Sequence, residues 1–248
     1  IGLRLLLSAL KLSDKNLSSQ DVGMRFVPKL NSLSRLETPL KALDLFLVED
    51  AMEAQRMVED VLKNNQRRVS LLEESENLLD SLILMNDPSA HNALFFWSDQ
   101  FHRGLVGLLA TKLVQKYQKP AFVAAVTADG TLVGSARIPE GREDFNVFEA
   151  LKHSEQHLIK YGGHPAAAGF ELEKDKAEEL ASALDQFFAG SKEAEALPTV
   201  HYYDQDLSFR EVKEFMNHWD RLEPFGTQFA APVFKISDLI FVAQKTLK

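Results

Sequence analysis

The sequence predicts an α/β fold in which helices flank a mixed sheet, and two observations lead to that class. Short apolar runs typical of buried strands, such as Ala121–Val126, alternate with amphipathic stretches typical of helices. Regular alternation of this kind indicates strands covered by helices. Ahead of it, a helical pattern runs from Glu49 to Met85 without any Pro or Gly. A helix of that length either packs on a neighbour or bridges two domains.

The composition is that of a globular protein of one large or two small domains. Its 248 residues are 45% hydrophobic and 26% charged, enough to bury a substantial core. A net charge of −8 argues against bulk, non-specific affinity for nucleic acid. It leaves a local basic groove open, because the field at a site depends on where the charges lie. The absence of cysteine excludes disulfides and thiolate metal sites.

We expect a cytoplasmic protein with no membrane association. No apolar run approaches the length of a membrane span. The start, Ile1–Leu7, is too short and lacks the flanks of a signal peptide. It looks like an internal helix cut open.

The elements follow from periodicity and from turn residues, taken in order. Residues 1–45 are predicted as short helices, and Ser18 to Asp21 can cap one of them. Asp129-Gly130 is a hairpin-type turn. Strands are expected at 93–97, 121–126, 131–137, 170–172, 232–236 and 239–243, and helices at 105–117, 146–160, 176–189 and 208–222.

The stretch Tyr161–Phe170, with Gly162-Gly163-His164 followed by small residues, is the strongest candidate for chemistry. Two glycines allow positive φ or close approach of a ligand to the backbone. Uncovered N–H groups can form an anion-binding nest, and an imidazole adds a hydrogen bond or a charge. From these residues alone, a tight turn that packs a helix on the sheet is the alternative.

Four motifs resemble those of a known family. Gly162–Gly169 is similar to the GGH-x-x-A-A-G signature of the DHH-associated C-terminal domain of DHH phosphoesterases. Phe101–Gly107, Gly134–Arg137 and Glu223–Gly226 resemble the RecJ branch, the single-strand-specific DNA exonucleases, in matching order. The resemblance covers most of the chain.

The resemblance implies a phosphate site built from several parts of the chain. His164 would contact the scissile phosphate, and Arg137 would grip a phosphate near the 5′ end. A further segment, Pro28–Leu36, resembles the end of the family's catalytic domain, with Ser34 at a position that is usually glycine. If that glycine is needed for a positive φ, Ser34 would strain or change the turn. The implied phosphate-binding residues are Arg137, Ser135, Gly134, Gly162, Gly163, His102, Arg103 and Arg35.

Each of these residues also has a structural interpretation. His102 and Arg103, at a helix start, could be a cap with an exposed histidine. Arg137 could pair with an acidic residue of its neighbourhood, His164 could be a satisfied core histidine, and Arg35 a helix-surface arginine. Bases could also stack on exposed rings, for which the candidates are Phe145, Tyr161, Tyr202 and Tyr203.

The resemblance divides the chain into four parts. Residues 1–45 would be the remnant of the catalytic DHH domain and 46–86 the connecting helix. Residues 87–195 would be the DHH-associated α/β domain, and 196–248 the start of an oligonucleotide-binding (OB) region, incomplete because a barrel needs five strands. Residues 190–198 are predicted to be a linker.

The family hydrolyses phosphodiesters with two divalent metals, Mn²⁺ or Mg²⁺, bound by aspartates and histidines. This chain has no D-H-H triplet and no H-H pair, so we expect no metal site in it. The expected function is part of a 5′→3′ single-stranded-DNA exonuclease in repair and recombination, a hydrolase that is inactive as this fragment. Expected partners are single-stranded DNA and repair proteins such as single-strand-binding protein. The alternatives are a non-catalytic binding module, or a phosphodiesterase for short oligoribonucleotides or cyclic dinucleotides.

Overall fold

A computed structural model describes residues 1–13, 16–142, 144–190, 202–237 and 239–240. The chain forms two compact units. The first comprises residues 1–2 and 29–193, and the second comprises residues 3–28 and 194–248. None of the described helices is both long enough and apolar enough to span a membrane.

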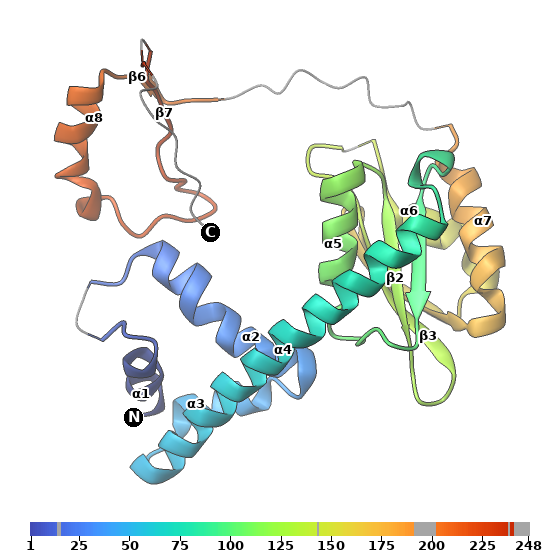
Figure 1. Cartoon of the computed structure of the whole chain (residues 1–248), viewed down its shortest axis with the longest axis horizontal. Coiled ribbons are helices and arrows are strands. Elements are labelled where there is room, and N and C mark those ends of the chain that lie inside the picture. The colour runs from blue at the N-terminus through green and yellow to red at the C-terminus, as the bar shows by residue number, and fades with distance from the viewer. Residues whose placement is uncertain (14–15, 143, 191–201, 238, 241–248) are drawn as a thin grey trace. The chain divides into compact units, whose positions relative to one another are not determined.

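The first unit contains a five-stranded mixed sheet of order β1-β2-β3-β5-β4 (Figure 1). β1 and β2 are parallel, and the other neighbours are antiparallel. The strands are β1 (Leu94–Ser98), β2 (Ala121–Val126), β3 (Thr131–Arg137), β4 (Lys160–His164) and β5 (Ala167–Glu173). The predicted α/β class with flanking helices is therefore confirmed.

Helices cover both faces of this sheet, on opposite sides in Figure 1. On one face, α5 (Val106–Tyr117) and the end of α4 (Ala51–Met85) enclose a core that includes Leu79, Leu109 and Val123. On the other face, α6 (Val147–His153) and α7 (Ala177–Phe188) enclose a core rich in aromatic rings, among them Phe122, Phe170 and Phe188. The alternating burial of β3 follows from this, since successive residues face opposite layers.

The long helix is confirmed, with a start that the sequence encodes. Asp50 is its N-cap, and the Asp50 Oδ1 accepts a hydrogen bond from the Glu53 N–H at 2.8 Å. Its buried residues recur at helical spacing and include Ala54, Val58, Val61, Leu79 and Ile83. An apolar stripe of this kind needs partners along its length, which explains why so long a helix is stable.

Two shorter helices precede it, α2 (Val27–Leu36) and α3 (Leu40–Leu47). The condition under which Ser34 would strain a turn is not met, because Ser34 lies inside α2. Its hydroxyl donates to the Asn31 carbonyl at 3.0 Å, and its φ is not positive. Serine is tolerated at this position because the backbone there is helical and does not need the positive φ that glycine allows.

The helix predicted at 146–160 is shorter than expected. α6 ends at His153, and a 3₁₀ turn (Glu155–His157) leads directly into β4. The buried Ser154 ends the helix, with its N–H donating to the carbonyls of Ala150 and Leu151. Pairing with β5 then draws the next residues into the sheet, a long-range effect that helical periodicity cannot report.

The predicted glycine-rich loop is a β-hairpin. β4 and β5 pair from Lys160 opposite Glu171 to His164 opposite Ala167, with Pro165-Ala166 at the turn. The strand expected at 170–172 is thus part of a longer one, and the expected loop is instead the end of one strand, a tight turn and the start of the next. This stretch forms a strand because β5 supplies hydrogen-bond partners for its backbone, and because glycines destabilise an edge strand only slightly.

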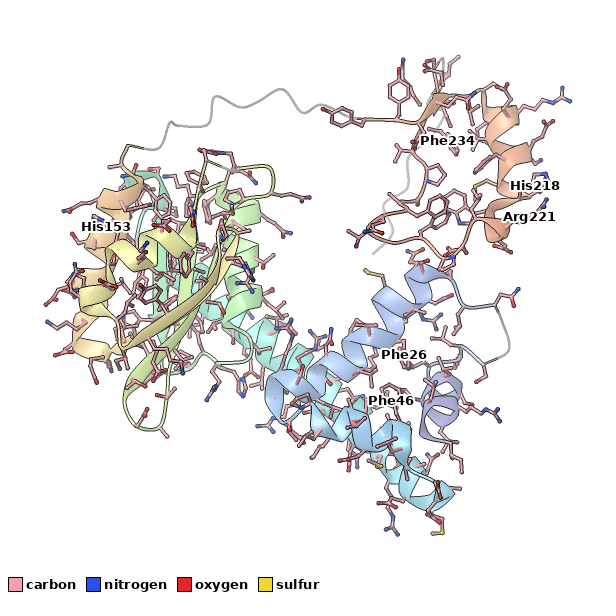
Figure 2. All side chains as sticks on the ribbon, turned by 180° about the vertical axis from the view of Figure 1, so that it is seen from behind. Phe26, Phe46, His153, His218, Arg221 and Phe234 are labelled. Carbon is pink, nitrogen blue, oxygen red and sulfur yellow. The ribbon has the colours of Figure 1, made fainter. Side chains whose placement is uncertain are left out.

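The second unit is smaller. Its elements are α1 (Gly2–Ala9), a π-helix (Asp21–Phe26), β6 (Gln205–Asp206), α8 (Phe209–Met216), a 3₁₀ turn (Trp219–Arg221) and β7 (Phe234–Lys235). Helix α8 ends earlier than the predicted 222. Figure 2 labels Phe234, whose ring lies 4.9 Å from that of Phe215 of α8.

Among the described residues the second unit shows one two-stranded pairing, β6 parallel to β7. The strand predicted at 232–236 is therefore reduced to two residues, because Pro232 cannot donate to a ladder. The OB-like region stays a prediction. The linker from 191 onward and most of the strand predicted at 239–243 lie outside the described residues.

Glu223 of the Glu-Pro-Phe-Gly motif is hydrogen-bonded to Ser19, at the start of a helical stretch. We call the hydrogen bonds that join Ser19, Glu223 and Phe225 the clasp. The Glu223 Oε2 accepts hydrogen bonds from the Ser19 N–H at 3.0 Å and from the Ser19 hydroxyl, and the Phe225 N–H donates to the Ser19 Oγ at 2.6 Å. The Phe225 N–H also donates to the Glu223 Oε2, at 3.2 Å. The hydrogen bond from the Ser19 hydroxyl lowers the pKa of Glu223, as do the bonds from the backbone N–H groups of Ser19 and Phe225. The clasp is thus strongest when the carboxyl group is ionised.

We expect Glu223→Gln to speed amide hydrogen exchange at Ser19 and Phe225 severalfold. Because the folded-state pKa of Glu223 is lowered, its stabilisation is present above the ordinary carboxyl pKa and is lost as pH falls through the lowered value. Hydrogen exchange measured by mass spectrometry at two pH values checks this. Glu214→Gln, which removes only an exposed pair with Arg210, is the control. Equal exchange in both variants would contradict the clasp.

Candidate phosphate-binding site

The sheet register brings two sequence-predicted residues into one row. Arg137 of β3 and His164 of β4 both lie opposite Ala167 of the intervening strand β5. Residues directly opposite each other share a face, so both side chains belong to the α5 side of the sheet. Their Cα atoms are about 10 Å apart, two strand spacings. One phosphate group can be reached from both sides of such a gap, because arginine is long.

The next row on the same face has almost no side chains. Ser135, Gly169 and Gly162 lie opposite one another across β3, β5 and β4. A Cβ built on Gly162 would meet nothing within 4 Å, and one on Gly169 would meet only the Gly134 carbonyl oxygen, at 3.8 Å. The floor of the site is thus open backbone with a serine at one side. A cavity of about 820 Å³ continues from this floor along β3, β4 and β5.

Helix α5 forms the wall behind Arg137. A Cβ built on Gly107 would lie 3.1 Å from the Arg137 Nη2 and 3.4 Å from the Ser135 Oγ. Gly107 therefore leaves room for the guanidinium group, which donates from Nη1 to the Ala136 carbonyl at 2.8 Å. Burial lowers the pKa of Arg137, and the charge of Arg35 lowers it further. The guanidinium remains charged, since its ordinary pKa is far above neutral.

Arg35 reaches this site from α2. Its Nη1 donates to the Gly104 carbonyl at 3.2 Å, and a Cβ on Gly104 would come within 1.8 Å of the Arg35 carbonyl oxygen. Only glycine permits that approach of two backbones. Burial and the nearby charge of Arg68, on α4, both lower the pKa of Arg35. The charges of Arg35, Arg68 and Arg137 thus act on one another from three different elements.

Together with the residues of the loop before α5, these arginines form what we call the cationic cluster: Arg35, Arg67, Arg68, His102, Arg103 and Arg137. None of its arginines forms an ion pair with a carboxylate among the residues that the structure describes. The arginines that do so are elsewhere, namely Arg25, Arg142 and Arg210. Like charges held together without counter-ions repel one another, and a bound anion relieves that repulsion. Guanidinium groups match phosphate oxygens in particular.

His102 lies within this cluster with a defined hydrogen bond. Its Nδ1 accepts from the Gly104 N–H at 3.1 Å, which leaves Nε2–H as the donor of the neutral ring. Burial lowers the pKa of His102, and so do the charges of Arg67 and Arg103. At neutral pH the ring therefore offers a hydrogen-bond donor, while the arginines supply the charge.

We expect Arg67→Gln to raise the pKa of His102, because one of the charges that disfavour its protonation is removed. Inorganic phosphate should raise it as well, by neutralising the cluster. Titration of the His102 Hε1 signal by NMR measures both effects. Arg56 is exposed on the same helix and lies outside the cationic cluster, so Arg56→Gln is the control. An unchanged His102 midpoint in Arg67→Gln and in phosphate would contradict this account.

Two of the predicted glycines have packing roles. Gly134 faces away from the site, where a Cβ would lie 2.1 Å from the Phe170 ring. Gly163 has a φ of +145°, and a Cβ on it would lie 2.5 Å from both the Ala167 carbonyl oxygen and the Ala168 Cα. Both residues shape the sheet beneath the open floor.

Of the four rings predicted as candidates for stacking with bases, the prediction for Phe145 is wrong. Phe145 is buried, at 5% exposure, and its ring lies edge-on to Phe188 with the Arg142 guanidinium above it. Tyr161 is partly buried against Phe148. Tyr202 and Tyr203 are exposed, at 85% and 45%. Local sequence does not distinguish these cases, because burial depends on what packs from elsewhere.

Comparison with known proteins agrees with the motifs. The family described as the DHHA1 domain matches residues 90–190. The single-stranded-DNA-specific exonuclease RecJ of Thermus thermophilus is 34% identical over 174 residues, covering 70% of this chain and 24% of its own length. The RecJ protein of Bacillus subtilis is 28% identical over 217 residues, covering 84% of this chain and 26% of its own.

The crystal structure of Thermus thermophilus RecJ in complex with Mn²⁺ matches with a TM-score of 0.77 and 28% identity, over 95% of this chain and 34% of that one. The chain is RecJ-like and carries a DHHA1 domain. RecJ was also crystallised in complex with Mg²⁺. The RecJ-like chain spans about a quarter of the length of the two curated relatives named above.

Within the RecJ-like fold, sequence analysis missed the contribution of Arg68 and Gly107. The sequence shows the pair Arg67-Arg68, but a solvated helix face is the simpler interpretation of two adjacent basic residues in a long helix. Only the packing of α4 shows that Arg68 is half-buried and lies near Arg35. Gly107 ends the motif Phe101–Gly107, but its role, which is to leave space for Arg137 thirty positions away, depends on packing that no local pattern contains.

Proposed function

We propose that this chain is the phosphate-binding part of a RecJ-like 5′→3′ exonuclease that hydrolyses single-stranded DNA in repair and recombination. The observation that carries the proposal is the cationic cluster, without counter-ions among the described residues, beside an open glycine floor. The relatives named as single-stranded-DNA-specific exonucleases support the substrate class. In this proposal Arg137, Arg35 and Ser135 hold phosphate oxygens, and His164 and His102 donate hydrogen bonds to them.

The residues that the structure describes offer no site for a divalent metal of the kind that the RecJ crystal structures contain. Among the described residues there is no group of three or more His, Cys, Asp or Glu side chains able to hold a metal ion. We therefore assign no metal-dependent step to this chain. Its proposed contribution is to bind and orient the strand and to stabilise negative charge on a phosphate. Cytoplasmic location and contact with single-strand-binding protein belong to the same proposal.

The test uses fluorescence anisotropy with a 5′-phosphorylated single strand of about 12 nucleotides, at several salt concentrations. We expect binding that weakens with salt, with a log–log slope of about −2, as for roughly three phosphate contacts. Removing the 5′-phosphate should weaken binding, and a duplex of the same sequence should bind less well. With Mn²⁺ added, we expect no release of nucleotides. Salt-independent binding, or Mn²⁺-dependent cleavage by this chain, would overturn the proposal.

A further inference from the structure

The sheet of the first unit has two edge strands, β4 beside the glycine floor and β1 at the opposite end of the strand order. β1 pairs on one side only, with β2. The Leu94 N–H donates to the Pro120 carbonyl at 2.8 Å, so in a parallel ladder Leu94, Phe96 and Ser98 direct their backbone groups to β2. Phe95 and Trp97 consequently direct their N–H and C=O groups outward. No backbone partner for those groups occurs in the part of the chain that the structure describes.

Among the residues that the structure describes, the β1 edge lacks the usual protection of an edge strand. Natural edge strands carry charged residues, proline or a bulge, or are covered by another element. β1 reads Leu-Phe-Phe-Trp-Ser, with no charge and no proline. The residues just before it are covered, since the Asp185 Oδ1 accepts from the N–H groups of Asn92 at 2.6 Å and Ala93 at 3.3 Å. The cover stops where the strand begins.

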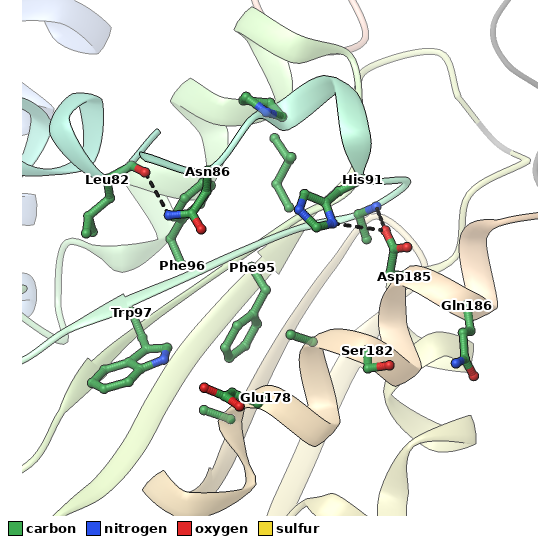
Figure 3. Close-up of a pocket in the computed structure, with 15 residues that line it drawn as sticks. Leu82, Asn86, His91, Phe95, Phe96, Trp97, Glu178, Ser182, Asp185 and Gln186 are labelled. Carbon is green, nitrogen blue, oxygen red and sulfur yellow. Dashed lines mark hydrogen bonds and ion pairs between the residues drawn. The ribbon is translucent and has the colours of Figure 1, made fainter. Parts of the chain in front are cut away.

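A cavity of about 740 Å³ runs along this edge (Figure 3). One wall is the end of α4, with Leu82 and Asn86, and the other is α7. The α7 wall presents small side chains, namely Ala177, Ala181 and Ser182. Figure 3 shows the rings of Phe95 and Trp97 directed to the same side of β1, toward α7, with Phe96 on the other side. The cavity therefore combines a strand edge with partly exposed aromatic surface.

The charge around the cavity is acidic. Its ionisable lining residues are Glu178, Asp185 and His91. Asp185 is occupied by the two backbone N–H groups and lies 3.8 Å from the His91 Nδ1. Glu178 is exposed and has no hydrogen-bond or ion-pair partner among the described residues, and Figure 3 places it beside Phe95. The Lys174 Nζ lies over the Trp97 ring at 5.1 Å, at the end of the strand.

We propose that the free edge of β1 binds an extended, basic segment of a partner protein by strand addition. The segment pairs with the outward backbone groups of Phe95 and Trp97. Apolar side chains at every second position cover the two rings, and a lysine or arginine lies opposite Glu178. This surface is separate from the cationic cluster, so the inference does not depend on the proposed function.

The test begins with an array of heptapeptides that carry valine, isoleucine or phenylalanine at alternate positions and lysine, threonine or glutamate between them. Hits are measured in solution by fluorescence anisotropy. We expect the lysine peptides to bind at least tenfold more tightly than the glutamate peptides. N-methylation of the backbone positions that pair with β1 should abolish binding, while N-methylation of the alternate positions should not. No bound peptide of any composition, or no effect of N-methylation, would overturn the proposal.

Two variants of the protein locate the binding. Glu178→Lys should reverse the preference between lysine and glutamate peptides, whereas Glu173→Lys makes the same charge change outside the cavity lining and should leave it intact. Ala181→Arg fills the cavity from an α7 position that tolerates a helix former, and should weaken binding at least tenfold. Circular dichroism confirms that each variant is folded. Unchanged binding in both Glu178→Lys and Ala181→Arg would contradict the assignment.

Direct readouts complete the test. Bound peptide should slow amide exchange at Phe95 and Trp97, and it should shift Trp97 fluorescence in a Trp219→Phe background that leaves one tryptophan. The competing occupant of the β1 edge is a second copy of this chain, and sedimentation without peptide tests for such a dimer. A dimer that Ala181→Arg dissociates would replace the proposal by edge-to-edge pairing between copies.

Discussion

Arg137→Ala is expected to weaken binding of a 5′-phosphorylated single strand by about tenfold or more at roughly 50 mM salt, since a hydrogen bond to a charged group contributes about 1.5–3 kcal/mol. The guanidinium is half-buried between β3 and Gly107 and has no carboxylate partner among the described residues. Arg137→Ala therefore removes a positive charge that no described carboxylate neutralises and that a bound phosphate neutralises. Arg137→Lys should retain part of the affinity, because an ammonium keeps the charge but not the bidentate fork. Fluorescence anisotropy measures all three proteins.

The controls separate a specific phosphate contact from net charge. Arg56→Ala makes the same charge change on an exposed part of α4 and should alter the affinity little. In Arg137→Ala the salt slope should become shallower by about 0.7, the amount expected for one lost phosphate contact on a single strand. The double variant with Arg35→Ala should lose less than the sum of the two single losses, because the two charges act on one another. Equal losses in Arg137→Ala and Arg56→Ala would contradict a specific site.

Gly163→Ala is expected to destabilise the first unit by about 2–4 kcal/mol, the sum of backbone strain and overpacking. At Gly163 the φ is +145°, and an added Cβ would lie 2.5 Å from backbone atoms of β5. At about 2–4 °C per kcal/mol, the melting temperature of that unit should fall by roughly 5–15 °C. Thermal unfolding followed by circular dichroism measures the change.

Gly162→Ala is the matched control for this prediction. The two glycines are adjacent in β4, but a Cβ on Gly162 meets nothing within 4 Å and its φ is not in the positive region. Its stability should change by no more than about 0.5–1 kcal/mol, in the direction of stabilisation. Because Gly162 forms part of the open floor of the candidate phosphate-binding site, Gly162→Ala should still weaken binding of single-stranded DNA. Similar melting temperatures for the two variants would refute the packing role of Gly163.

The hairpin of β4 and β5 illustrates where sequence analysis stops. From the residues, Gly162–Gly169 reads as a loop, because glycine and alanine carry no strand pattern. The structure pairs this stretch with β5, and β5 with β3, and that register places His164 in the row of Arg137. Register depends on hydrogen bonds between segments far apart in the chain, so no local window contains it.

The expected site residues come from motifs in the sequence, whereas their arrangement comes from the tertiary structure. His102, Arg137 and His164 were singled out by motif, and the structure places all three on the α5 side of one sheet or in the loop before α5. What joins them was not predictable. Arg68 enters from the long helix, and Gly104 permits the close approach of Arg35. Both effects depend on helix packing, which periodicity predicts only as an apolar stripe.

The sequence by itself determined the α/β class, the long helix, the strands β1, β2 and β3 with part of β5, and the RecJ-like motifs. Those features depend on local periodicity, capping and residue type, which act within a few residues of one another. The tertiary structure alone decided that the glycine motif is a hairpin, that five arginines and a histidine form one cluster, and that β1 has an open edge. Each of these depends on contacts between distant segments, where side-chain space and strand register, not local preference, set the free energy.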